Sequence, residues 1–212
     1  MLALVDALNS ILPQTQCQRC GYCGCMPYAQ AMASGEALPN RCPPGDVQGL
    51  HRLAATLGIA PMALDPSCGA PGPRLIAQID NSLCIGCTKC IPVCPTDAIV
   101  GAPKLQHWVI TDACTGCELC LPPCPVNCIS FKIATKEQSH LTQWLQTDAD
   151  QARERYDRKQ KRANSNVALT SASGPVTSSP VTSSPVELAL ETARQRAQQR
   201  LSLNPPKVNN KP

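Results

Sequence analysis

Eight cysteines between residues 84 and 124 have a spacing suited to binding metal. Each half of this stretch reads C-x2-C-x2-C-x3-C-P, and the second half repeats the first thirty residues later. A [4Fe-4S] cluster has four irons, each of which requires one thiolate, and cysteines at this spacing on a tight loop can turn their sulfurs to one side. The repeats therefore predict two [4Fe-4S] clusters. The cysteines are Cys84, Cys87, Cys90 and Cys94 in the first repeat and Cys114, Cys117, Cys120 and Cys124 in the second.

The fourth cysteine of each repeat is followed by a proline, Pro95 or Pro125, which turns the chain away from its own loop. In the bacterial ferredoxin run, to which this spacing corresponds, that cysteine ligates the neighbouring cluster. Gly86 and Gly116 would let the backbone pass close to the inorganic sulfides. The predicted ligand sets are thus Cys84, Cys87, Cys90 and Cys124 for one cluster, and Cys114, Cys117, Cys120 and Cys94 for the other.

A third group of cysteines near the N-terminus reads C-x2-C-x4-C-x16-C and consists of Cys17, Cys20, Cys25 and Cys42. We predict a third [4Fe-4S] cluster here, with zinc as the alternative because C-x2-C pairs also bind zinc. Zinc is a weaker alternative for the two repeats, since it needs neither a third cysteine nor a terminal Cys-Pro. A disulfide framework is disfavoured because the N-terminus does not resemble a secretory signal. Cys23, Cys68 and Cys128 lie outside the three sets and receive no role.

The composition limits the size of the core. The chain has 212 residues, with 15 cysteines, 21 prolines and only 3% aromatic residues, so metal clusters would have to stabilise its small domains. Residues 1–132 hold seven Lys/Arg and eight Asp/Glu, whereas residues 133–212 hold twelve and seven. We expect this basic tail to be solvated and disordered, with attraction to an acidic partner as the alternative.

The remaining pattern predicts an α+β protein. Helical spacing covers residues 2–12, 27–35 and 46–58, and the last of these helices has Asp46 as its predicted N-cap and Gly58 as its predicted C-cap. Short strands are predicted at 75–80, 97–101, 107–112 and 128–133. In the polar stretch that follows, Leu141, Trp144 and Leu145 look like a stripe that packs on the ferredoxin domain. The predicted order is a small helical four-cysteine Fe-S domain (1–62), a connector (63–74), a pseudo-symmetric two-[4Fe-4S] ferredoxin-type domain (75–133), a helical extension (134–162), and a flexible tail (163–212) in which 186–201 could form a helix.

These features favour an electron-transfer protein without a substrate-converting site of its own. His51, His107 and His140 are isolated histidines and are expected to be surface or core residues, and no nicotinamide or flavin motif occurs, so partners must supply two-electron chemistry. A redox-sensing or scaffold protein with structural clusters is the alternative, while a nucleic-acid binder is disfavoured because the basic tail lacks interleaved aromatic residues. No apolar stretch approaches 18 residues, so we expect a cytoplasmic protein with at most peripheral membrane contact.

Over roughly residues 8–133 the chain resembles the B subunit of the Rnf-type, or Rsx, electron-transport complex. The resemblance implies three [4Fe-4S] clusters and electron transfer between flavin- or NADH-linked subunits of an oxidoreductase whose NADH–ferredoxin exchange is coupled to ion movement. Family members usually begin with a membrane anchor, which this sequence does not show, and usually have proline where this chain has Cys23. That difference suggests that Cys23 is an additional, non-ligand packing thiol, with an alternative ligand and a source of heterogeneity as the other interpretations. The matching segments are LPQTQC (12–17), CGYCGC (20–25), CPPG (42–45), CIGCTKC (84–90), CPTDAIVG (94–101) and CTGCELC (114–120).

Overall fold

The computed structural model describes residues 2–134 and 144–172, with side chains of the last helix described up to residue 165. The chain divides into two compact units, Met1–Asn166 and Val167–Pro212, and the first contains all twelve predicted ligands. Mixed helices and short strands confirm the α+β class. The suggested helix at 186–201 lies outside the described residues, and the division into five segments stays a prediction.

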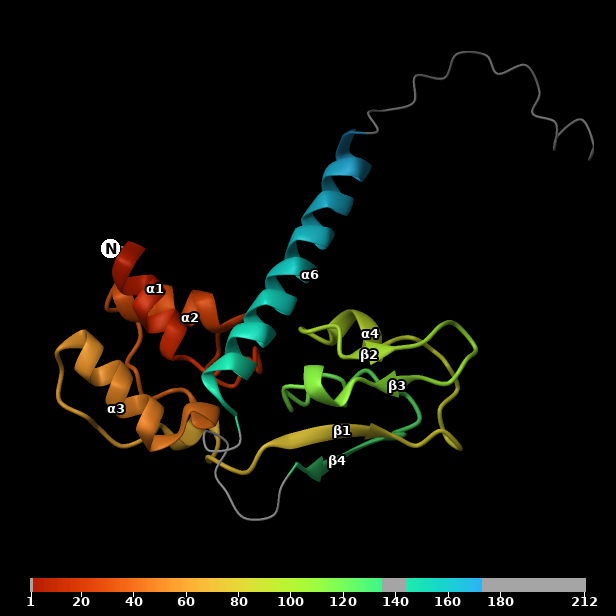
Figure 1. The fold of residues 1–212 in the computed structure, drawn as a ribbon, viewed down its shortest axis with the longest axis horizontal. Coiled ribbons are helices and arrows are strands. Elements are labelled where there is room, and N and C mark those ends of the chain that lie inside the picture. Colours follow the sequence, from red (N-terminus) through yellow and green to blue (C-terminus); the bar gives the residue numbers. More distant parts are fainter. Residues whose placement is uncertain (1, 135–143, 173–212) are drawn as a thin grey trace, which may run out of the picture. The chain divides into compact units, whose positions relative to one another are not determined.

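Three helices form the N-terminal part of the first unit: α1 (Leu2–Ile11), α2 (Cys25–Ala33) and α3 (Asp46–Leu57) (Figure 1). Helix α1 ends before Pro13, whose ring cannot continue a helix. Helix α3 ends at Gly58, which has the predicted left-handed conformation with φ of 68°. The predicted N-cap is wrong by one residue, because the 3-10 turn Pro43–Gly45 runs directly into the helix and makes Gly45 the cap.

The strands fall within the four predicted segments and form two antiparallel pairs. Strand β1 (Leu75–Ile79) pairs with β4 (Ile129–Ile133), and β2 (Ile99–Val100) pairs with β3 (Trp108–Val109). A one-turn helix, α4 (Cys90–Val93), follows the first cysteine loop. The core of this region consists of buried cysteines together with Ile76, Ala77, Ala98, Ile99 and Ile129, so the sulfur-bearing side chains are part of the core itself.

The backbone of the two cysteine repeats has matching dihedral angles at residues thirty positions apart. Gly86 and Gly116 have φ of 66° and 68°, Thr88 and Glu118 both have 62°, and Asp97 and Asn127 have 49° and 50°. A non-glycine residue with positive φ is uncommon, so its recurrence at paired positions indicates that the local loop geometry repeats. Pseudo-symmetry of the whole ferredoxin-type domain stays a prediction.

Helix α6 (Gln146–Ala172) continues past the predicted boundary at residue 162 (Figure 1). Trp144, just before it, is buried; its Nε1 donates to the carbonyl of Pro13 over 2.8 Å, and the guanidinium of Arg74 lies 4.4 Å from its ring centroid. The predicted stripe is therefore wrong for Leu145, which is 63% exposed, and Leu141 lies outside the described residues. The contact of Trp144 with Pro13 in the N-terminal region was also not predicted.

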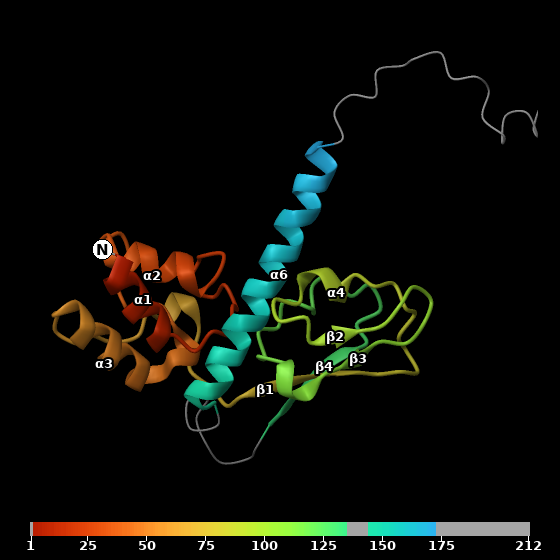
Figure 2. The same cartoon turned by 45° about the horizontal axis from the view of Figure 1, so that its top comes forward.

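Farther along α6, basic side chains reach the end of the first cysteine repeat. Lys159 Nζ donates to the carbonyl of Pro92 over 2.7 Å and to the carbonyl of Cys94, and Arg162 pairs with Asp97. Helix α6 runs past α4 in both views (Figure 2). Its contacts therefore join both cysteine-bearing regions of the first unit. None of the helices in residues 2–134 and 144–172 is long and apolar enough to cross a bilayer.

Candidate iron-sulfur sites

Four cysteines from both repeats line one cavity, which we call the first-repeat site. The cavity is lined by Cys84, Cys87, Cys90 and Cys124, together with His107, Cys128 and four aliphatic residues. Burial raises the pKa of the Cys90 thiol, and negative charge on Cys87, Cys124 and Cys84 raises it further. Cys124 thus lies with three cysteines of the other repeat, and its ligation of a cluster shared with them stays a prediction.

The reciprocal set, which we call the second-repeat site, contains Cys114, Cys117, Cys120 and Cys94. Burial raises the pKa of Cys117 to about 11 and that of Cys120 to about 12, and in both cases Cys94 and Cys114 add to the increase. Backbone N–H groups donate to two of these sulfurs, from Ala98 to Cys94 over 3.2 Å and from Ala77 to Cys114 over 3.5 Å. Such donors stabilise negative charge on a thiolate.

The N-terminal site gathers Cys17, Cys20, Cys25 and Cys42 around one cavity. Burial raises the pKa of Cys25 to about 12, with further increases from Cys17 and Cys20. Burial also raises the pKa of Cys42 well above its ordinary value, and the other three thiols add to this. The predicted group of four is therefore brought together here too.

A buried chain of amide side chains supports the N-terminal site. Gln16 accepts a hydrogen bond from the Cys25 N–H over 2.8 Å and donates to Gln14 over 2.9 Å, and Gln14 donates to Asn9 Oδ1 over 3.0 Å. A Cβ at Gly24 would lie 2.8 Å from Gln16 Oε1, so a larger residue there would displace the Gln16 side chain. Sequence reasoning gave these glutamines no role, and the LPQTQC segment was the only signal that could have found them.

The three sets have the donor chemistry that a [4Fe-4S] cluster requires, because each offers four thiols around a cavity or within a buried core. The described residues contain no group of three or more Cys, His, Asp or Glu that could hold a metal ion. A cluster of four irons needs its thiolates spread over a wider core than a single ion does. Burial raises the pKa of Cys25 and of Cys120 to about 12, so these two thiols are neutral at pH 7 without metal, and cluster binding would release their protons.

Two of the cysteines without an assigned role lie beside the sites. Cys128 Sγ is 3.5 Å from Cys124 Sγ and lines the first-repeat site. Burial is the largest cause of the raised pKa of Cys20, and negative charge on the buried Cys68 is a smaller cause. Cys23 is exposed. Nothing in the spacing of Cys68 and Cys128 revealed this proximity, which arises from the tertiary fold.

His107 was expected to be an ordinary surface or core residue, yet it lies against the sulfurs of the first-repeat site. It is 1% exposed, and its Nδ1 lies 3.6 Å from Cys90 Sγ and 3.8 Å from Cys84 Sγ. His51 is exposed on α3, and His140 lies outside the described residues. An isolated histidine gives no signal in the sequence that separates these cases.

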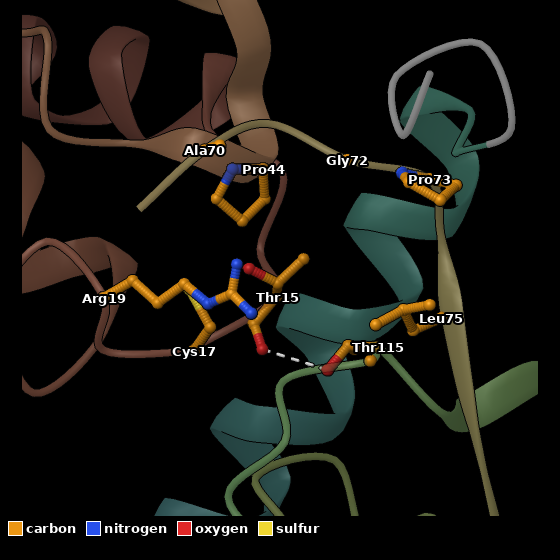
Figure 3. A pocket seen from close by; sticks show the side chains of 10 residues that line it. Thr15, Cys17, Arg19, Pro44, Ala70, Gly72, Pro73, Leu75 and Thr115 are labelled. Atoms are coloured by element: carbon orange, nitrogen blue, oxygen red, sulfur yellow. Dashed lines mark hydrogen bonds between the residues drawn. The ribbon is translucent and has the colours of Figure 1, made fainter. Parts of the chain in front are cut away.

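The N-terminal region and the second repeat meet along a cleft that Figure 3 shows from close by. Thr115 Oγ1 donates to the carbonyl of Thr15 over 2.9 Å (Figure 3), and Arg19 pairs with Glu118 over 2.8 Å. Cys17 and Thr115 both line this cleft. The two polar contacts therefore attach the loop of the N-terminal site to the loop of the second-repeat site.

Comparisons with known proteins agree with these sites. A family model described as "4Fe-4S dicluster domain" matches residues 77–131, and one described as "Putative Fe-S cluster" matches residues 12–44. Relatives named as the B subunit of an ion-translocating oxidoreductase complex include proteins from Thiobacillus denitrificans (53% identity; 51% of this chain, 58% of the relative), Azoarcus sp. strain BH72 (56%; 50% and 58%) and Shewanella amazonensis (52%; 63% and 70%). The chain thus spans 58% of the length of the first two. No solved structure matches.

Proposed function

Because this chain belongs to the B-subunit family of ion-translocating oxidoreductase complexes, we propose that it relays single electrons through three [4Fe-4S] clusters. The observation that carries the proposal is the grouping of twelve cysteines into three sets of four, two of which exchange a cysteine between repeats. An exchange of this kind is the ligation pattern of two-cluster ferredoxins. The match to the dicluster family model supports the same function.

The proposed ligands are the three sets described above: Cys17, Cys20, Cys25 and Cys42; Cys84, Cys87, Cys90 and Cys124; and Cys114, Cys117, Cys120 and Cys94. A bound [4Fe-4S] cluster supplies a reversible one-electron change of charge. The chain contributes burial, which keeps water from the sulfurs, and backbone N–H donors such as those of Ala77 and Ala98. We further propose the pseudo-symmetric ferredoxin-type domain at 75–133, the four-cysteine domain at 1–62, and the remaining segments at 63–74, 134–162 and 163–212.

The proposed partners are redox proteins, in particular flavin- or NADH-linked subunits that carry out the two-electron chemistry. The printed names of the relatives, which refer to a component of an oxidoreductase complex, support such partners. We propose that the chain works at the cytoplasmic face of the inner membrane, through contacts with those partners.

The test is anaerobic purification followed by iron, sulfide and zinc analysis and an EPR-monitored reductive titration. Three clusters predict about twelve irons and twelve sulfides per chain, since each cubane holds four of each. About eight irons with one zinc would contradict the N-terminal cluster. Clusters that are present but cannot be reduced reversibly by a low-potential donor would overturn the relay and favour a scaffold or redox-sensing role.

A further inference from the structure

The imidazole of His107 faces the first-repeat site from within the core. Its Nδ1 lies within hydrogen-bond reach of two sulfurs, at 3.6 Å from Cys90 Sγ and 3.8 Å from Cys84 Sγ, and it lines the same cavity as both. Its other ring nitrogen, Nε2, is buried without a hydrogen-bond partner. A thiolate can only accept a hydrogen bond, so a ring that pairs with a cluster-bound thiolate through this nitrogen must carry a proton on Nδ1.

The second-repeat site has no such ring at the corresponding position. A Cβ on Gly86 would lie 2.5 Å from the carbonyl oxygen of Leu105, and a Cβ on Gly116 would lie 2.5 Å from that of Leu75. Each glycine therefore packs against a leucine backbone, and the two leucines are thirty residues apart like the cysteines. Two residues beyond each leucine stand His107 and Ala77.

Because these two residues differ, a different nitrogen atom approaches the sulfurs at each site. At Ala77 the backbone N–H donates to Cys114 Sγ over 3.5 Å, whereas at His107 a side-chain nitrogen approaches the sulfurs. Gly101 provides the space for the ring, since a Cβ there would lie 1.8 Å from His107 Cδ2. His107 thus places a side-chain nitrogen beside the sulfurs of the first-repeat site, where the second-repeat site has the alanine side chain of Ala77.

We propose that His107 donates an Nδ1–H hydrogen bond to thiolate sulfur in the first-repeat site and raises the reduction potential of the cluster held there. Reduction adds one negative charge that the sulfurs share, and a donor to sulfur stabilises the reduced state more than the oxidised state. His107 is a positioning residue in this proposal, which rests on the proposed electron-transfer function.

The first experiment compares the cluster potentials of three variants with those of the unchanged protein by EPR-monitored titration. His107→Leu removes the donor and should shift the oxidised-to-reduced ratio of one cluster about tenfold toward oxidised at a fixed potential, equivalent to ~59 mV for a one-electron couple. His107→Asn, whose amide nitrogen can take the place of Nδ1, should restore most of the shift. His51→Ala on exposed α3 is the control and should change nothing.

The second experiment does not depend on a variant retaining its clusters. Protein labelled with ¹⁵N-histidine should show ¹⁵N hyperfine coupling in pulsed EPR for one reduced cluster, and the coupling should persist in His51→Ala. Absence of coupling, or unchanged potentials in His107→Leu protein with full iron content, would overturn this inference and leave the proposed function intact. Clusters that cannot be reduced reversibly would overturn both.

Discussion

The loops of the two cysteine repeats have matching backbones but different surroundings. Thr115 is 3% exposed and donates to the carbonyl of Thr15, whereas Ile85, thirty residues earlier, is 58% exposed. Glu118 pairs with Arg19, while the corresponding Thr88 bonds to the carbonyl of its own neighbour, Cys87. The second loop is therefore attached to the N-terminal region and the first is open along its outer face.

This difference separates two properties of the sites. Spacing and backbone geometry repeat, and they gather the same number of thiols at each site. The residues that surround the thiols do not repeat. His107 lies at the first-repeat site, whereas Thr115 belongs to the loop of the second-repeat site. A duplicated motif can thus hold two clusters of the same kind while the rest of the chain makes them unequal.

The largest expected effect comes from the cysteines that the repeats exchange. Cys94→Ala should abolish the same EPR signal as Cys114→Ala, because both lie in the second-repeat site, and Cys124→Ala should abolish the same signal as Cys84→Ala. Each variant should lose about four irons. If Cys94→Ala instead matched Cys84→Ala, the exchange between repeats would be disproved.

A smaller effect is expected at the glycines that the loops share. In both Gly86→Ala and Gly116→Ala the new Cβ would lie 2.5 Å from a backbone carbonyl, and φ is positive at both positions. We expect a cost of about 3 kcal/mol from the strain and the clash, which would lower the anaerobic Tm by roughly 6–12 °C.

The matched control for these variants is Gly35→Ala, where φ is +81° but a Cβ would meet nothing within 4 Å. Gly35→Ala should show only the conformational penalty of about 1 kcal/mol. Equal Tm losses in all three variants would mean that the close approach of the two backbones contributes nothing.

Thr115→Val sharpens the comparison between the loops at lower cost. Valine keeps the shape but leaves the buried carbonyl of Thr15 without its donor, which should cost about 1.5 kcal/mol and lower Tm by roughly 3–6 °C. Ile85→Val in the exposed first loop should change Tm by less than this, since its side chain is largely in water. Equal shifts in the two variants would contradict the different surroundings of the loops.

The smallest effect is expected for the Arg19–Glu118 pair, whose side chains are 35% and 33% exposed. A double-mutant cycle with Arg19→Met and Glu118→Gln should give a coupling energy of about 0.5 kcal/mol at low salt. Salt screens exposed charges, so the coupling should vanish at about 1 M NaCl. A coupling that survived high salt would indicate a contact more buried than the structure has.

The parts of the molecule that depend on local sequence could be predicted. The metal-binding spacing, the helix that ends at Pro13 and the strands around the cysteine loops each follow from residues close together in the chain. Other features could not be predicted, because they depend on residues that tertiary packing brings together and that show no periodic spacing in the sequence. These features are the positions of His107 and Gln16 and the contacts of α6. Asp46 failed as a cap because a preceding 3-10 turn moved the start of the helix, which only the backbone shows.

The exchange of cysteines between the repeats also has a consequence for biosynthesis. A ribosome that has reached residue 94 has made every cysteine of the first repeat, but only three of the four proposed ligands of the first-repeat site. Cys124 emerges thirty residues later, and β1 cannot pair with β4 until Ile133 has followed it. A nascent chain that ends between the repeats therefore carries three thiols of the first-repeat site and one thiol of the second-repeat site, and neither site is complete until the second repeat has been made.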